Sequence, residues 1–175
     1  MVAPVGAWLK TIRYVDTLSR WVGKLVAWIV IPLVLGATYE VFARYVFNAP
    51  TIWAYDLSYM LYGGHFMLGA GYALLNKAHI RTDIFYEKWS PRTQGWVDAI
   101  AYLFLFFPGM IFFFLSGWDS AYYSWTIREV SDATAWQPPV YPLKMAVPVG
   151  AILLMIQGVA ELLKSLYAAR HGEWP

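Results

Sequence analysis

Four long apolar stretches, separated by polar segments, dominate the pattern of this 175-residue chain. They cover about residues 25–43, 57–75, 99–118 and 145–163. A helix of roughly 20 residues crosses the hydrocarbon core of a bilayer, and backbone groups in lipid must be paired within their own segment. The pattern therefore predicts an all-α integral membrane protein, with four transmembrane helices in a single membrane domain that covers residues 1–175.

The segment before the first span, residues 5–24, has a different pattern. One helical face carries Lys10, Arg13, Thr17, Arg20 and Lys24, and another carries Trp8, Ile12, Val15 and Val22. Apolar residues on one face and basic residues on the other are typical of a helix that lies in the interface of an anionic membrane. We expect an N-terminal amphipathic helix on the cytoplasmic leaflet. We also expect it to stay in the mature protein, because Leu35-Gly36-Ala37 lacks the small residues of a cleavage site.

Prolines indicate where the helices start and bend. Ser90-Pro91 has the N-cap and first-position residues that favour a helix start, and it predicts the beginning of the third helix. Pro50, after Asn48-Ala49, predicts the beginning of the second helix in the same way. Pro108-Gly109 falls inside the third helix, so we expect a bend there.

Composition and charge support the membrane assignment and predict the orientation. Only 14% of residues are charged, against about 25% in soluble domains. There is no cysteine, which excludes disulfides and thiolate sites. Most basic residues flank the spans on one side: Lys10, Arg13, Arg20, Lys24, Lys77, Arg81, Lys88, Arg92, Lys164 and Arg170. Only Arg44, Arg128 and Lys144 fall on the other side, so both termini are predicted to be cytoplasmic.

Few residues suggest chemistry. Phosphate-binding glycine loops, paired-histidine metal motifs and nucleophile elbows are absent from the sequence, so we expect no enzyme, no cofactor and no metal. His65 lies within the second span, where we predict a structural hydrogen bond to a Ser, a Tyr or a carbonyl on a neighbouring helix. The alternative is a proton or ligand role. A bis-histidine haem is disfavoured, because His79 lies roughly 21 Å further along the helix.

Polar residues also gather where the first two spans end on the outer side. Glu40 and Arg44 have the favourable acid-first spacing, and Asp56 enters the second span at a similar depth. We predict that Arg44, Asn48, Trp53 and Asp56 form one polar-aromatic cluster, in which the planar fork of Arg44 bridges neighbouring groups. Two interpretations remain open: a structural ion cluster, or a contact surface for a partner.

Small residues recur at four-residue spacing in two spans, as Gly69 with Ala73 and as Ala146 with Gly150. Such pairs let helix backbones approach closely. The spacing does not decide whether the neighbouring helix belongs to this chain or to another subunit.

Two motifs resemble a known family. The first is Arg44-Tyr45-Val46-Phe47-Asn48-Ala49-Pro50 with Trp53 and Asp56, and the second is His79-Ile80-Arg81-Thr82-Asp83 before Pro91-Arg92. With the four-span layout, they resemble the small membrane subunit (DctQ-like) of tripartite ATP-independent periplasmic (TRAP) transporters. The family commonly has acidic residues after the Trp, whereas here Ala54-Tyr55 precede a single Asp56.

The resemblance implies a function in the bacterial inner membrane. A periplasmic solute-binding protein would deliver an organic acid or related solute to a large membrane subunit, which moves it by sodium-driven symport. This chain would be the non-catalytic scaffold of that secondary transporter, with the large subunit, the binding protein and the lipid bilayer as partners and no nucleic acid. His79, Arg81 and Asp83 join Glu40, Arg44, Asn48, Trp53 and Asp56 as candidate inter-helix or partner-interface residues. Two alternatives remain: a haem or quinone membrane-anchor subunit of a respiratory enzyme, and a small self-sufficient exporter.

Overall fold

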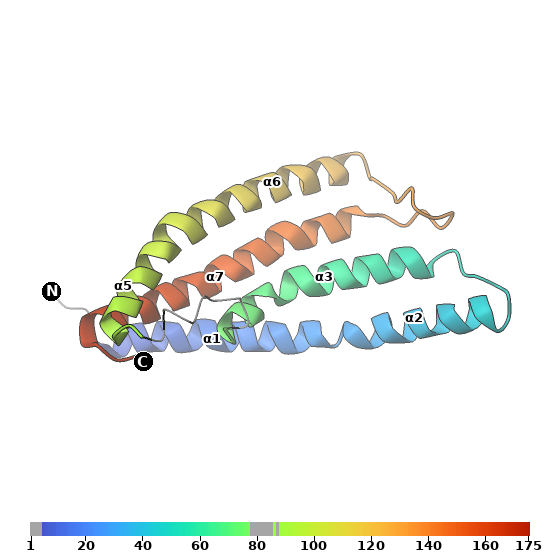
Figure 1. Cartoon of the computed structure of the whole chain (residues 1–175). Coiled ribbons are helices and arrows are strands. Elements are labelled where there is room, and N and C mark those ends of the chain that lie inside the picture. Colours follow the sequence, from blue (N-terminus) through green and yellow to red (C-terminus); the bar gives the residue numbers. More distant parts are fainter. Residues whose placement is uncertain (1–4, 78–85, 87) are drawn as a thin grey trace. The chain divides into compact units, whose positions relative to one another are not determined.

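The computed structural model describes residues 5–77, 86 and 88–175, and the elements formed by these residues are all helices (Figure 1). Three helical stretches among them are long and apolar enough to cross a membrane: Trp8–Tyr45, Pro91–Thr126 and Tyr141–His171. The prediction of an all-α protein with membrane-spanning helices is confirmed to this extent.

The first stretch consists of α1 (Val5–Ala27) and α2 (Val30–Tyr45). A tight turn separates them, in which Trp28 and Ile29 donate to the carbonyls of Leu25 and Val26, three residues back. The predicted amphipathic helix, residues 5–24, corresponds to α1, which ends three residues later, at Ala27. Its burial follows the sequence pattern, because on the predicted apolar face Ile12 is buried and Trp8, Val15 and Val22 are half-buried. The five residues of the predicted basic face are all exposed.

The second predicted span corresponds to α3 (Ala54–Leu75), a helix of 22 residues. It is long enough to cross a bilayer, but it is not among the three stretches that are also sufficiently apolar. Its tyrosines, its glycines and His65 dilute the apolar residues. Membrane insertion of α3 therefore remains a prediction.

The third helical stretch has a π-helical segment in its middle. It comprises α5 (Pro91–Ala101), the π-helix η1 (Tyr102–Phe106) and α6 (Phe107–Thr126). Ser90 accepts a hydrogen bond from the Thr93 backbone and Pro91 follows it, so the predicted N-cap is confirmed. The N–H of Phe107 donates to Tyr102, five residues back. This wider turn directly precedes Pro108, whose ring would clash with a normal α-helical carbonyl, and such turns are a known cause of bends.

The last helix, α7 (Tyr141–His171), is longer than the predicted span 145–163. The prediction stopped near Lys144 and Lys164, because charged residues are costly in hydrocarbon. Both lysines instead lie on the helix and have carboxylate partners, Glu129 for Lys144 and Asp16 with Glu161 for Lys164. Paired charges do not require the helix to end.

The chain forms two compact units. Unit 1 contains the described residues of 1–22, 70–112 and 152–175, and unit 2 contains residues 23–69 and 113–151. In unit 1, α5 and α7 meet at Gly95, where an added Cβ would lie 2.5 Å from the Ser165 carbonyl oxygen. In unit 2, α7 and α3 meet at Gly150, where an added Cβ would lie 2.5 Å from the Met67 carbonyl oxygen. The neighbour of Gly150, one member of the Ala146/Gly150 pair, is therefore a helix of this same chain.

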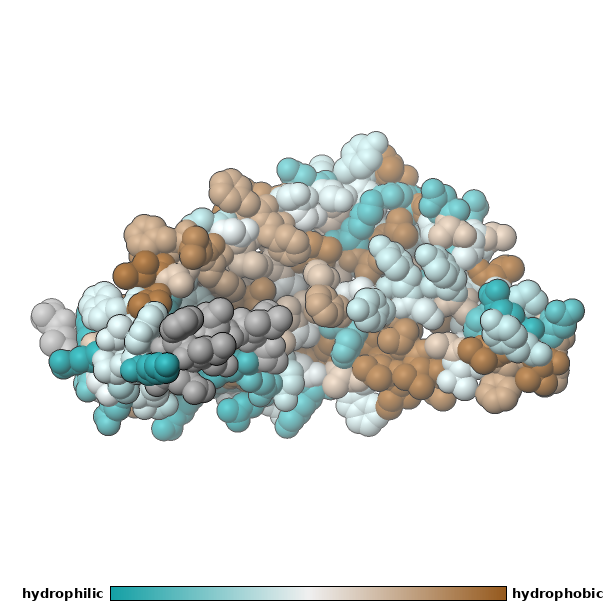
Figure 2. Space-filling model, in the orientation of Figure 1, coloured by the Kyte–Doolittle hydropathy of each residue, from teal (hydrophilic) through white to brown (hydrophobic). Residues whose placement is uncertain are grey.

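Large apolar side chains lie on the surface of several helices (Figure 2). Leu105, Phe112 and Trp28 are 74%, 73% and 68% exposed. Patches of this kind are rare on soluble monomers and are typical of surfaces that contact lipid or another protein. The exposed apolar surface therefore supports the membrane location that the length and composition of the helices indicate.

Candidate functional site

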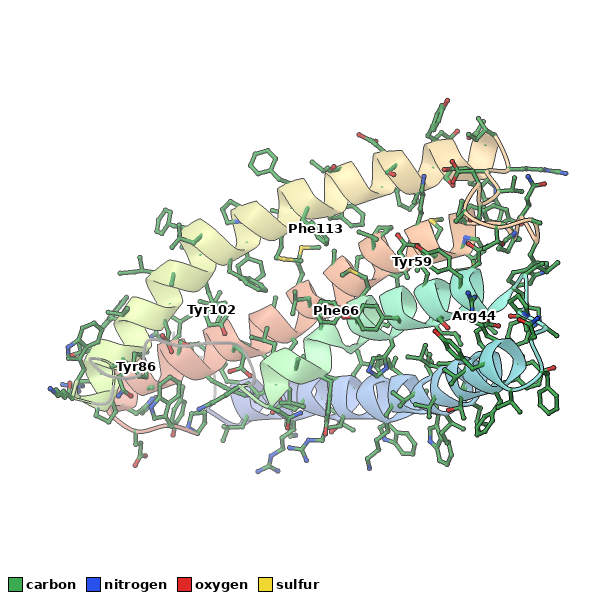
Figure 3. The ribbon with its side chains drawn as sticks, turned by 45° about the vertical axis from the view of Figure 1, so that its right-hand side comes forward. Arg44, Tyr59, Phe66, Tyr86, Tyr102 and Phe113 are labelled. Atoms are coloured by element: carbon green, nitrogen blue, oxygen red, sulfur yellow. The ribbon has the colours of Figure 1, made fainter. Side chains whose placement is uncertain are left out.

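Glu40 connects the end of α2 to the loop that follows it. Its Oε1 atom accepts hydrogen bonds from Nε and Nη2 of Arg44, at 2.9 and 2.5 Å. Its Oε2 atom accepts the backbone N–H of Thr51 at 3.0 Å and the Thr51 hydroxyl at 2.5 Å. Arg44 lies near the end of α2 (Figure 3). Its side chain is 53% exposed, whereas that of Glu40 is only 16% exposed. The carboxylate, rather than the guanidinium, is therefore the centre of these contacts.

The loop 46–53 reverses the chain between α2 and α3. Asn48 has a φ of 49°, a left-handed conformation that Asn tolerates better than most residues. The ring of Trp53 stacks on Tyr39, with the two centroids 5.9 Å apart. The left-handed backbone at Asn48 and the stacking of Trp53 on Tyr39 explain why a polar residue and a large aromatic residue occur in this short loop.

The prediction that Pro50 opens the second helix is wrong. The helix α3 begins at Ala54, four residues later, and the Ala54 backbone N–H donates to the Thr51 hydroxyl at 3.3 Å. Glu40 holds both the N–H and the hydroxyl of Thr51. Thr51 therefore stays outside the helix and caps it, which the local sequence around Pro50 does not reveal.

Asp56, in the first turn of α3, is buried and binds the loop 127–140. It is 2% exposed, its Oδ1 accepts the Ser131 hydroxyl at 2.6 Å, and its Oδ2 accepts the Thr134 hydroxyl. Hydrogen bonds to a charged acceptor are stronger than neutral ones. The positive end of the α3 dipole also favours a carboxylate at this position. The buried charge is thus stabilised by two hydroxyl groups and a helix N-terminus.

The predicted single cluster of Arg44, Asn48, Trp53 and Asp56 is therefore wrong in its partners. Among the described side chains, Arg44 pairs with Glu40, whereas Asp56 pairs with hydroxyl groups from a distant loop. Both contact groups lie in unit 2. They are separate because Arg44 donates to Glu40, four residues earlier on the same helix, whereas both oxygens of Asp56 accept hydroxyls from the loop 127–140.

The loop 127–140 is folded back on itself. The Ser131 backbone N–H donates to Pro138 at 2.8 Å, and that of Val140 donates to Glu129 at 3.0 Å. Ser131 and Thr134 also accept the backbone N–H groups of Ala133 and Trp136 through their side-chain oxygens, at 3.2 and 3.3 Å. The hydroxyls that donate to Asp56 therefore also shape their own turns.

An ion pair joins this loop to α7. Lys144 Nζ lies 2.6 Å from Glu129 Oε2, and the two side chains are 35% and 31% exposed. The hydrogen bond from the Lys144 ammonium lowers the pKa of Glu129 below its ordinary value. The pair therefore contributes stability above the ordinary pKa of Glu129, and this contribution is lost as the pH falls through the lowered value.

A cavity of about 380 Å³ lies between this loop and the first turns of α3 and α7. Its charged lining consists of Asp56, Glu129, Asp132 and Lys144. The acids outnumber the base, so the cavity suits a cationic or hydrogen-bond-donating group better than a free organic acid. Nothing in this lining suggests a transport site for an anion.

His65 bonds to the helix break between α1 and α2. Its Nδ1 lies 3.1 Å from the carbonyl oxygen of Val26, so Nδ1 carries the proton and donates. The predicted structural contact, a hydrogen bond to a carbonyl on a neighbouring helix, is present. Among the described residues, no group of three or more His, Asp or Glu side chains could hold a metal ion.

The comparisons with known proteins place the chain in a family. Residues 33–167 match the family model of the DctQ component of tripartite ATP-independent periplasmic transporters. The chain belongs to the DctQ family. A search of curated proteins found no match. The match begins in α2 and ends in α7, so Glu40, Asp56 and the loop 127–140 all lie in the part that this DctQ component shares with its family.

Three of the predicted interface residues of this DctQ component, His79, Arg81 and Asp83, lie outside the described residues. Sequence reasoning also missed a polar network in unit 1. Gln157, fully buried, donates to Asp16 at 3.0 Å and to Glu161 at 3.1 Å, and accepts from Ser19 at 2.7 Å. Lys164 contacts both carboxylates. The sequence did contain a signal, because Gln157, Glu161 and Lys164 are four and three residues apart and therefore share one face of a helix.

Proposed function

We propose that this DctQ-family chain is the non-catalytic small membrane subunit of a sodium-driven secondary transporter for an organic acid or a related solute. Its partners would be a large membrane subunit and a periplasmic solute-binding protein. The observation that carries the proposal is the family match, which covers α2 to α7 together with the two loops that contact Glu40 and Asp56. The proposed role is a scaffold that packs against the large subunit.

The side-chain contacts support a structural role. The buried carboxylates Asp56 and Glu161 are both engaged by groups of this chain. The apolar exposed side chains of α2 and α6 leave a broad surface for lipid or a membrane partner. Polar groups thus stabilise the helices of this subunit, and apolar surface remains for assembly.

We propose the following topology for the bacterial inner membrane. The helix α3 crosses the membrane as the second of four spans, and α1 lies on the cytoplasmic leaflet. Both termini are cytoplasmic, and the whole chain forms a single membrane domain. The distribution of basic residues supports this orientation. Reporter fusions at Asn48 and Asp132 should read as periplasmic, and fusions at Lys88 and Gly172 as cytoplasmic. A periplasmic signal at Lys88 would contradict the topology.

Reconstitution tests the function. The chain should co-purify with the proposed large membrane subunit. Proteoliposomes that contain both subunits should take up solute only with a sodium gradient and the loaded binding protein. Vesicles with this chain alone should show no uptake. Uptake by the chain alone, or full uptake by the large subunit without it, would refute the scaffold role.

A further inference from the structure

Unit 1 contains a second cavity, of about 330 Å³, that the scaffold role does not explain. It lies among α1, α5, α7 and the C-terminal segment, with Lys77 beside it. Its charged lining is Arg13, Asp16, Lys77, Asp98, Glu161 and Lys164. Its volume is at the lower end of the range for ligand sites, about 300–1,000 Å³. This size suits a polar headgroup rather than a whole lipid.

The basic side chains of the cavity are only partly used within the chain. Lys164 binds Asp16 at 3.0 Å and Glu161 at 2.7 Å. Arg13 and Lys77 have no carboxylate partner among the described residues, and Lys77 lies over the Trp174 ring, 5.4 Å from its centroid. These two exposed cations in the lining of the cavity can therefore still bind an anionic group such as a phosphate.

The acidic side chains also keep free acceptor atoms. The contacts with Lys164 and Gln157 use Oδ1 of Asp16 and Oε1 of Glu161. The second oxygen of each carboxylate has no hydrogen-bond partner within the part of the chain that the structure describes. Each can accept a further N–H, and a primary ammonium supplies three such donors.

We propose that this cavity binds a phosphoethanolamine group, with its phosphate at Arg13 and Lys77 and its ammonium at Asp16 and Glu161. The formal charges of the lining, three basic and three acidic, sum to zero. A headgroup with a phosphate and a primary ammonium matches this balance, whereas a phosphate alone supplies no donor to the second oxygens of Asp16 and Glu161. Because α1 and α7 belong to stretches that can cross a membrane, the source that fits best is the headgroup of a phospholipid. The proposal requires only a membrane location, not the transport role.

The test measures lipid binding to this chain, purified alone in detergent. After delipidation, phosphatidylethanolamine, phosphatidylglycerol or soluble phosphoethanolamine is added, and bound lipid is measured by native mass spectrometry. The Arg13→Gln/Lys77→Gln double variant is compared with Lys10→Gln/Arg20→Gln, which removes the same charges from exposed positions of α1 outside the cavity. Equal thermal midpoints of both variants without lipid serve as the control for folding.

The expected result is that the wild type and the Lys10/Arg20 control bind phosphatidylethanolamine equally. The Arg13/Lys77 variant should bind it at least about tenfold more weakly, the loss that about 1.4 kcal/mol produces. Soluble phosphoethanolamine that competes as well as the lipid would support the site and identify a soluble ligand. Equal binding of phosphatidylglycerol, or equal losses in both double variants, would overturn the proposal.

Discussion

The buried carboxylate of Asp56 offers the sharpest test of how the loop 127–140 is held. Replacing it by Ala removes the acceptor of both the Ser131 and the Thr134 hydroxyls. A hydrogen bond to a charged group contributes about 1.5–3 kcal/mol, so losing two should cost at least about 3 kcal/mol. The opening of the loop should therefore become roughly a hundredfold more frequent, because each 1.4 kcal/mol is a factor of ten.

Hydrogen–deuterium exchange measures this local opening directly. The backbone N–H groups of Ala133 and Trp136 donate to the two hydroxyls that Asp56 holds, so peptides from residues 127–140 should exchange roughly a hundredfold faster in the Asp56→Ala variant. The Asp56→Asn variant should lie between, because an amide oxygen still accepts one hydroxyl. Helix α7 should exchange at the wild-type rate at its centre, which shows that the protein remains folded.

The matched control is Asp132→Ala, which removes an exposed acid from the same loop. It should leave the exchange of the loop unchanged. If Asp56→Ala and Asp132→Ala give the same exchange, the two hydroxyl bonds do not hold the loop. If Asp56→Ala leaves the loop protected but abolishes the response to the loaded binding protein, Asp56 belongs to a docking surface instead.

Three further predictions follow from contacts in unit 2 and are checked by thermal unfolding of the purified complex. Glu40→Ala should lower the free energy of unfolding by about 2 kcal/mol, because Arg44 and Thr51 both lose their partner. Arg44→Ala should lower it by only about 0–1 kcal/mol, because Arg44 is largely exposed. A larger loss in Arg44→Ala than in Glu40→Ala would contradict the geometry. Gly150→Ala should lower the free energy of unfolding by about 1–3 kcal/mol, because the added methyl group would clash with the Met67 backbone. Gly64→Ala should be neutral or stabilising, because the space around Gly64 is open. Equal effects of the two variants would refute the close approach of α7 to α3 at Gly150. His65→Gln keeps a donor for the carbonyl on α1 and should preserve both stability and sodium-driven uptake, whereas uptake lost in an assembled complex would show a functional histidine.

The sequence was sufficient for features that depend on neighbouring residues. Apolar runs about as long as a bilayer crossing predicted the helices. Ser90-Pro91 predicted the start of α5, because capping involves atoms within one turn. The same holds for the helix α1, whose buried and exposed positions follow its own periodicity. The motifs around Arg44 and His79 were enough to indicate the family, since such motifs are read residue by residue along the chain.

Only the tertiary structure decided which polar groups meet. Asp56 pairs with Ser131 and Thr134, which lie more than 70 residues further along the chain, and Glu40 rather than Arg44 is the centre of its group. The neighbour of Gly150 is likewise a backbone carbonyl on another helix. A buried charge takes whichever donors the packed helices bring within about 3 Å. That choice depends on how the helices pack, and helix packing is not readable from the spacing within any one of them.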